Sequence, residues 1–573
     1  MLLNLRYGYS PRPSWITSAA LRLCKGITTG LGTLALWALP GQCAETIYFD
    51  YNIFSRSLPI SSLETYAADG SVDHELATYL ALMPPEAQAQ LQTILNQPLT
   101  GLNPDIEDRN FSSFALSQWL YSPIGERVLF DVGKLVQTNA RQNSWKALRA
   151  AMIFTADDDE ELSLINILRQ FPAENIRVDL ALAQDLARAV QTNVNTTDQL
   201  VIDLAQWAQV AAALEPTLNY SALPSLEARA PFDVVKRSLV LTDSARDRTY
   251  SVDLYRPDDL SNIEGPIPVM VLSHGYGDTN VDSLEIARSL AANGFVVALP
   301  EHIGSSKAYQ EALEYGLVDE SFEALEFVNR PRDISFLLDT LEQQNAGEFQ
   351  ERLQLDRVGV MGHSFGGYTA LATAGATVDV EQLQQQCNPA AEIGPELVNI
   401  GLLLQCRLLE LESVPGALTA LTSGELADER VGLVIAIAPI TNLFGSQGMD
   451  HLKVPVVMLG GAYDVAAPVI LEQVDAFASL TGTDKYFYLG EKISHNLELT
   501  RTLFSLLHPG EEAEERVDQS LETSVSIVRT LSIAHGRTYL LGEDSYLPYL
   551  TAAYVQAVST EPAKIHLIRD LPF

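Results

Sequence analysis

The sequence predicts an α/β fold, a mostly parallel sheet flanked by helices, preceded by a domain made only of helices. Three observations support this. Apolar residues recur at intervals of three and four between residues 44 and 214, the period of an amphipathic helix. From residue 232 onward, short runs of Val, Ile and Leu alternate with helical segments, as expected for strands buried on both faces. The third observation is a Gly-rich turn between one such run and a helix.

The N-terminal region, residues 44–214, contains no grouping of side chains that suggests chemistry. Residues 215–231 include three prolines and are interpreted as a linker. The helices expected in the N-terminal region include residues 123–137, 144–154, 162–171, 179–191 and 200–214.

The C-terminal region, residues 232–573, begins with two alternating segments, Val234–Leu241 and Thr249–Tyr255, that predict an antiparallel pair. An insertion at residues 377–430 interrupts the later pattern and is rich in leucine. We interpret it as a cap over the strand ends, where a doubly wound sheet places its site. The expected parallel strands are Val269–Leu272, Gly294–Leu299, Val358–Met361, Val431–Ala438, Val454–Leu459 and Tyr486–Leu489.

The first 43 residues differ from the rest of the chain. They carry four basic residues and no acidic one, and a short apolar run precedes small residues near Cys43 and Ala44. This order is typical of a signal peptide and predicts export to a periplasmic or extracellular compartment. An uncleaved membrane anchor is the alternative.

Cleavage after Cys43 would leave two cysteines, Cys387 and Cys406. An even number in an exported protein predicts a disulfide. Two buried free thiols are the alternative.

The net charge of −36 limits the partners of this protein. Nucleic acid is excluded as a partner because phosphate binding requires a concentrated basic face. An anionic membrane surface would also repel the chain on average. The hydrophobic content of 47% is that of an ordinary globular protein with a large core.

The Gly-rich turn reads Gly362-His363-Ser364-Phe365-Gly366 and lies between the run Val358–Met361 and a helical segment. A Gly-x-Ser-x-Gly motif in this strand–turn–helix context is typical of the α/β-hydrolase fold, where it exposes a nucleophilic serine. We therefore predict that Ser364 is the nucleophile. The helix that follows directs its N-terminal dipole toward developing negative charge.

An oxyanion hole is expected beside this serine. Ser273-His274-Gly275-Tyr276-Gly277 follows the strand Val269–Leu272. A turn there can place the Tyr276 N–H opposite the nucleophile, and the Phe365 N–H would be the second donor. His274 is expected to stabilise the turn rather than transfer protons.

A serine nucleophile requires a base and an orienting acid, which follow it in this fold in the order acid, then histidine. His495 follows the last expected strand, Tyr486–Leu489, and is the predicted base. Asp464 follows the strand Val454–Leu459 and is the predicted acid. A turn or helix-capping aspartate is the alternative role for Asp464.

Residues 232–507 resemble the dienelactone-hydrolase-like and platelet-activating-factor acetylhydrolase-like branch of the α/β-hydrolases. The resemblance lies in Ser273-His274-Gly275, Pro300-Glu301-His302 and Gly362–Gly367. Gly461–Pro468 and Ser494-His495 also resemble the acid and base loops of bacterial cutinase-like polyester hydrolases. The acetylhydrolases take their acid from the loop after the strand that precedes the one before Asp464. In this chain that loop follows Val431–Ala438 and has no carboxylate near the end of the strand. Residues 45–214 are similar to an N-terminal domain of unknown function found in cyanobacterial hydrolases.

These features together predict a serine hydrolase that cleaves carboxylic esters of lipids or acylated small molecules, with no metal or other cofactor. A peptidase or thioesterase with the same triad is one alternative. A non-catalytic binding protein that uses the helical domain is another. The cap is a candidate for contact with a membrane surface, and the partner of the helical domain is unknown.

Overall fold

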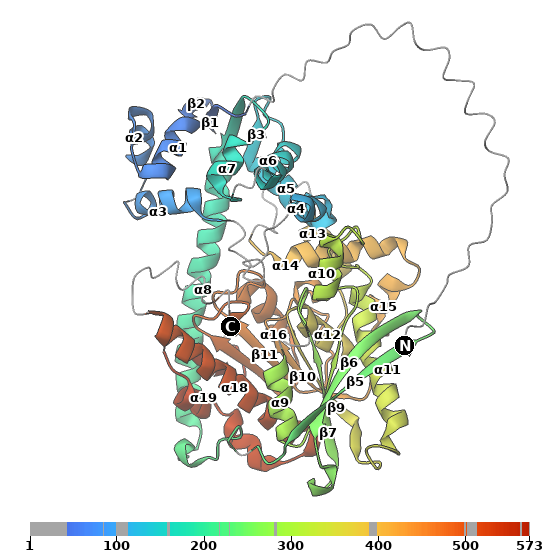
Figure 1. Ribbon diagram of the computed structural model, residues 1–573. Helices are drawn as coiled ribbons and strands as arrows, with labels where there is room; N and C mark the ends of the chain where they lie inside the picture. The colour runs from blue at the N-terminus through green and yellow to red at the C-terminus, as the bar shows by residue number, and fades with distance from the viewer. Residues whose placement is uncertain are drawn as a thin grey trace, which may run out of the picture. The chain divides into compact units, whose positions relative to one another are not determined.

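The computed structural model describes residues 43–83, 85–98, 113–157, 161–216, 218–228, 230–279, 283–388, 398–497, 500, 513–561 and 564–571 (Figure 1). Within these ranges, no helix is both long and apolar enough to cross a membrane. The predicted leader lies outside them except for Cys43. The choice between a signal peptide and an anchor therefore stays a prediction.

The N-terminal region contains a four-stranded sheet, so the prediction of an all-helical domain is wrong. β1 (Thr46–Tyr51) pairs with β2 (Phe54–Pro59) and, in parallel, with β4 (Asn175–Asp179), which pairs with β3 (Val136–Thr138). The strands are three to six residues long, too short to show a clear alternation. The β1–β4 pairing also joins segments far apart in the sequence, which local periodicity cannot reveal.

The helices of this region pack around a core of their own, which includes Ile47, Leu63, Leu120 and Ile176. Their ends have local causes: Gly70 ends the first helix in the left-handed conformation, at φ 76°. The helices are α1 (Ile60–Asp69), α2 (His74–Leu80), α3 (Pro85–Asn96), α4 (Ser113–Tyr121), α5 (Pro123–Leu135), α6 (Trp145–Asp157) and α7 (Leu164–Arg169).

One helix of 35 residues, α8 (Leu180–Leu214), replaces the two helices expected over this segment. The Asp179 side chain accepts hydrogen bonds from the Ala181 and Leu182 N–H groups and starts the helix. Further along, Leu200 and Leu204 are buried in the same core as the central sheet. This tertiary burial stabilises a helix across a polar stretch of low intrinsic propensity.

The central sheet has nine strands in the order β13-β12-β11-β10-β9-β7-β8-β6-β5. The six from β12 to β8 are parallel, and β13, β6 and β5 pair antiparallel. All eight expected strands are present, and β13 is an additional strand that the sequence did not indicate. The strands are β5 (Val234–Asp243), β6 (Arg248–Pro257), β7 (Ile267–Ser273), β8 (Val296–Pro300), β9 (Leu353–His363), β10 (Val431–Ile437), β11 (Val456–Gly461), β12 (Lys485–Gly490) and β13 (Ile565–Ile568).

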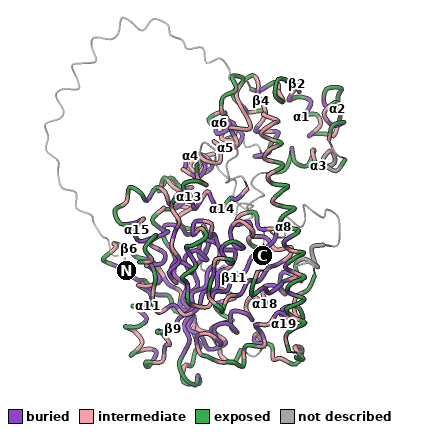
Figure 2. Tube along the Cα trace, turned by 180° about the vertical axis from the view of Figure 1, so that it is seen from behind, coloured by how far each residue is buried: buried purple, intermediate pink, exposed green. Residues whose placement is uncertain are grey.

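Both faces of the central sheet are buried, as the continuous apolar runs predicted (Figure 2). In β7, Val269 and Val271 belong to one apolar core and Met270 and Leu272 to another. The helices that follow or flank the strands are α9 (Leu284–Ala292), α10 (Lys307–Glu314), α11 (Glu326–Asn345), α12 (Phe365–Thr373), α16 (Asp475–Ser479), α18 (Ala513–Leu541) and α19 (Ala552–Val558).

The insertion at residues 377–430 contains α13 (Val380–Gln386), α14 (Gly401–Gln405) and α15 (Ala417–Ser423). The predicted disulfide is present: Cys387 and Cys406 are joined, with Cα atoms 5.5 Å apart. The Gly401 N–H donates to the Ala466 carbonyl, in the loop after β11. The insertion therefore contacts a loop at the carboxyl end of a central strand.

Candidate active site

Ser364 lies in a tight turn between β9 and α12. Its backbone has φ 55° and ψ −115°, a conformation that costs a non-glycine residue about 1–3 kcal/mol. A Cβ atom on Gly362 would lie 2.1 Å from the Gly366 carbonyl oxygen, and one on Gly366 would lie 2.0 Å from that of Ser273. Both flanking positions therefore require glycine. The Ser364 N–H donates to the Ile437 carbonyl at the end of β10, which holds the turn against the sheet.

Asp464 and His495 form a hydrogen-bonded pair at the carboxyl ends of β11 and β12. His495 Nδ1 lies 2.8 Å from Asp464 Oδ2. The other carboxylate oxygen, Oδ1, accepts the Ala466 and Ala467 N–H groups at 2.9 and 2.7 Å. Asp464 thus has both roles considered for it, since it holds its own turn and orients the histidine. With the proton on Nδ1, the Nε2 lone pair of His495 is available as a base.

His363, the residue before Ser364, connects the Ser364 turn to the loop that carries His495. Its Nε2 lies 2.8 Å from the His495 carbonyl oxygen and donates to it. The two imidazole rings are 4.8 Å apart between centroids. The structure therefore brings Ser364, Asp464 and His495 to one edge of the sheet.

A second carboxylate, Asp278, lies beside His363 with Oδ2 3.4 Å from Nδ1. Burial opposes the charged form of His363, but the hydrogen bond and the charge of Asp278 outweigh it and raise the pKa of His363. Burial likewise acts to raise the pKa of Asp278, and His363 outweighs it and lowers that pKa. The shifts are in the directions expected of an ion pair next to His495. The sequence did not reveal this pair, because His363 occupies a variable position of the Gly-x-Ser-x-Gly motif and Asp278 lies outside it.

Two backbone N–H groups, those of Tyr276 and Phe365, were expected to form the oxyanion hole. Neither of them donates a hydrogen bond to another of the described residues. The Gly366 contact with Ser273 places the start of α12 against the end of β7, from which the Tyr276 turn continues. His274 stabilises this turn, as expected: its Nε2 accepts the His302 N–H at 2.9 Å, and Nδ1 donates to the Gly275 carbonyl. Burial lowers the pKa of His274 well below the usual value, so it stays neutral.

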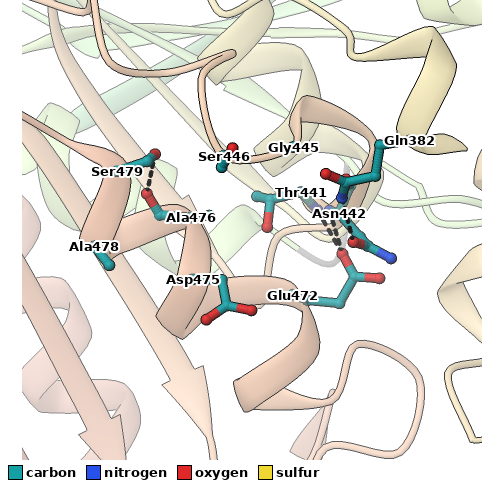
Figure 3. A pocket seen from close by; sticks show the side chains of 10 residues that line it. All are labelled: Gln382, Thr441, Asn442, Gly445, Ser446, Glu472, Asp475, Ala476, Ala478 and Ser479. Carbon is teal, nitrogen blue, oxygen red and sulfur yellow. Dashed lines mark hydrogen bonds between the residues drawn. The ribbon is translucent and has the colours of Figure 1, made fainter. Parts of the chain in front are cut away.

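A cavity of about 400 Å³ lies beside the loop after β10, and none of the three predicted triad residues lines it. Figure 3 shows Glu472 reaching this loop, where it accepts the Thr441 and Asn442 N–H groups at 2.6 and 2.8 Å. The same carboxylate accepts from the Asn399 and Gln405 side chains of the insertion at 2.6 and 2.7 Å. Burial raises the pKa of Glu472, against the effect of these four donors. Glu472 therefore connects the insertion to the loop after β10, the loop in which the sequence has no carboxylate near the strand end.

Comparison with known families adds evidence of a different kind. Residues 43–179 match the model of DUF1400, described as an alpha/beta hydrolase family of unknown function. The chain has the α/β-hydrolase fold. The match supports a hydrolase, although the matched residues form the N-terminal region and precede the sheet that carries Ser364. No curated protein shows significant sequence similarity to the chain. Within the described ranges, no group of three or more His, Cys, Asp or Glu side chains is arranged to hold a metal ion.

Proposed function

We propose that this protein is a serine hydrolase that cleaves carboxylic esters through an acyl-enzyme on Ser364. The observation that carries the proposal is the 2.8 Å contact between Asp464 and His495 at the sheet edge where the strained Ser364 turn also lies. A nucleophile, an acid and a base that follow one another in this order along an α/β-hydrolase fold are the pattern of a hydrolytic triad.

The proposed reaction has two halves. Ser364 Oγ attacks the ester carbonyl while His495 Nε2 takes its proton, and Asp464 stabilises the imidazolium that forms. The oxyanion accepts hydrogen bonds from the Tyr276 and Phe365 N–H groups, neither of which is bonded to another residue in the part of the chain that the structure describes. His495 then protonates the leaving alcohol. Water, activated by the same histidine, releases the acid from the acyl-enzyme.

Lipid or acylated small-molecule esters are the proposed substrates. Support comes from the leucine-rich insertion, which contacts the loop of Asp464, and from the resemblance to acetylhydrolase-like enzymes. Export is supported by the disulfide. A peptidase or thioesterase reaction would use the same three residues. A binding protein is disfavoured because binding alone does not require a strained serine beside a paired histidine.

The test combines covalent labelling with turnover. A fluorophosphonate probe should label the wild type and the matched control Ser446→Ala, an exposed serine, but not Ser364→Ala. A series of p-nitrophenyl esters of graded chain length should show the same pattern in turnover. A thioester and a p-nitroanilide offered in parallel separate the three reaction classes. Equal labelling of Ser364→Ala and the wild type would refute the assignment.

A further inference from the structure

We propose that Arg330 is a positioning residue that holds both oxyanion-hole donors in place, an inference that rests on the function proposed above. Arg330 lies on α11, next to Pro331 within the helix. Its side chain is 0% exposed and is among the largest fully buried side chains of the described residues. A buried guanidinium is costly unless it is paired and hydrogen-bonded, so its partners indicate its role.

The first partner is the backbone of the turn that carries Tyr276. Arg330 Nη1 donates to the His274 carbonyl at 2.7 Å, and Nη2 donates to the Gly275 carbonyl at 3.1 Å. The Gly275 carbonyl belongs to the same peptide unit as the Tyr276 N–H. Because a trans peptide is planar and its C=O and N–H point in opposite directions, a donor on the oxygen fixes where the N–H points.

The same contact polarises that peptide. The Gly275 oxygen also lies 2.7 Å from His274 Nδ1, which donates to it. Two donors on one carbonyl oxygen, one of them charged, strengthen the hydrogen bond that the N–H of the same peptide can give. Arg330 and His274 therefore fix the direction of the Tyr276 N–H and strengthen the hydrogen bond that it can donate.

The second partner is Phe365, whose N–H is the other proposed donor. The Arg330 guanidinium lies over the Phe365 ring, 4.1 Å from its centroid. The ring is fully buried and also packs against Phe327 at 4.8 Å. One side chain thus contacts both the peptide that carries the Tyr276 N–H and the ring of Phe365.

The guanidinium is itself held rigidly. Ser305 Oγ accepts from Nε at 2.9 Å and from Nη2 at 2.8 Å, and it donates to Glu326 Oε2 at 2.8 Å. Glu326 Oε2 lies 3.8 Å from Arg330 Nε. Burial lowers the pKa of Arg330 to about 10, with Glu326 opposing the shift, so the group is cationic at neutral pH. Lysine could not replace it, because one ammonium cannot span this fork of acceptors.

The experiment compares Arg330→Met and Arg330→Lys with the wild type on one soluble ester, after a thermal melt shows that each is folded. Arg332→Met is the matched control, since Arg332 lies on the same helix, is 40% exposed and pairs with Glu425. The measured quantities are kcat, KM and the inhibition constant of a boronic acid, which mimics the tetrahedral intermediate. We expect Arg330→Met to lose about 10²-fold or more in kcat, the loss typical of one oxyanion donor. KM should change less than about threefold, and boronate affinity should fall with kcat/KM.

Arg330→Lys should also lose at least about tenfold in kcat, because it keeps the charge but not the fork. A folded Arg330→Met with wild-type kcat and boronate affinity would overturn the proposal, as would a loss confined to KM. If Arg330→Met does not fold, the double variant Arg330→Met/Glu326→Gln removes the carboxylate whose charge Arg330 helps to balance, and it is judged by the same criteria. Arg248, which also pairs with Glu326, keeps its ion pair with Asp333 in this double variant. Ser364→Ala in the same assay separates the two ideas: its full activity would refute the proposed function, whereas a fully active Arg330→Met refutes only this inference.

Discussion

Replacing Asp464 with asparagine tests the hydrogen bond on which the proposed triad depends. The asparagine oxygen should take the place of Oδ1, because the Ala466 and Ala467 N–H groups require an acceptor there. The amide NH₂ then faces His495 Nδ1 and forces that nitrogen to accept. The imidazole proton moves to Nε2, so the histidine can no longer take the Ser364 proton.

We expect kcat to fall by about 10⁴, the loss typical of a triad whose histidine has the wrong tautomer. At about 1.36 kcal/mol per decade, this is roughly 5.5 kcal/mol of transition-state stabilisation. The control is Asp450→Asn, whose carboxylate lies 3.2 Å from His451 on an exposed loop, and which should change kcat by less than about tenfold. Both variants are measured at one pH on one soluble ester after a folding check. A nearly normal Asp464→Asn with an inactive Asp450→Asn would refute the reasoning.

Three further changes probe the charges, the core and the cross-link. Asp278→Asn should lower the pKa of His363, seen by NMR titration. The pKa of His363 is raised above 6.5 and that of Asp278 is lowered below 3.8, so both groups are charged between the two pKa values. The stability lost in this variant should therefore be largest in that pH range and shrink as pH rises through the raised pKa of His363. An equal loss at pH 9 would contradict the ion pair. Leu204→Ala, at a fully buried position, should lower the free energy of unfolding in urea by about 2–5 kcal/mol. The control Ile202→Ala, at a position 50% exposed on the same helix, should lower it by less than about 0.5 kcal/mol. Equal losses would argue against burial of α8 in the central core. Replacing both cysteines of the disulfide, which are 19 positions apart, with serine should cost about 3 kcal/mol, and unchanged stability would show that the cross-link does not constrain the unfolded chain.

The features predicted correctly are those with local causes. Each strand that lies inside the central sheet is buried on both faces, so its own residues form an apolar run that can be recognised without its neighbours. The Gly362–Gly366 turn is recognisable from its own residues, because the Gly366 carbonyl leaves no room for a side chain at Gly362. Gly366 is constrained from outside the turn, by the Ser273 carbonyl at the end of β7. The positions of Asp464 and His495 followed from strand order alone, since parallel strands end at one edge of a sheet.

The errors share a different cause, the long-range origin of the stabilising contact. β1 pairs with β4 across more than a hundred residues, and β13 pairs with β12 only after α18 and α19. Short strands of this kind depend on hydrogen bonds from a distant partner. The two helices expected over residues 179–214 are one helix because Leu200 and Leu204 are buried by the central core.

In the site, the sequence by itself determined which residues could be nucleophile, base and acid, because each follows its own strand in a fixed order. Tertiary structure decided what surrounds them. Three charged residues lie at buried positions of α11: Glu326, Arg330 and Asp333. Their spacing on an otherwise apolar helix face is a feature of the sequence that indicates a buried network of charges. Their partners, however, lie on other strands and turns. An electrostatic network acts through distances in space, so only the folded chain shows that Arg330 contacts the peptide of Tyr276 and the ring of Phe365.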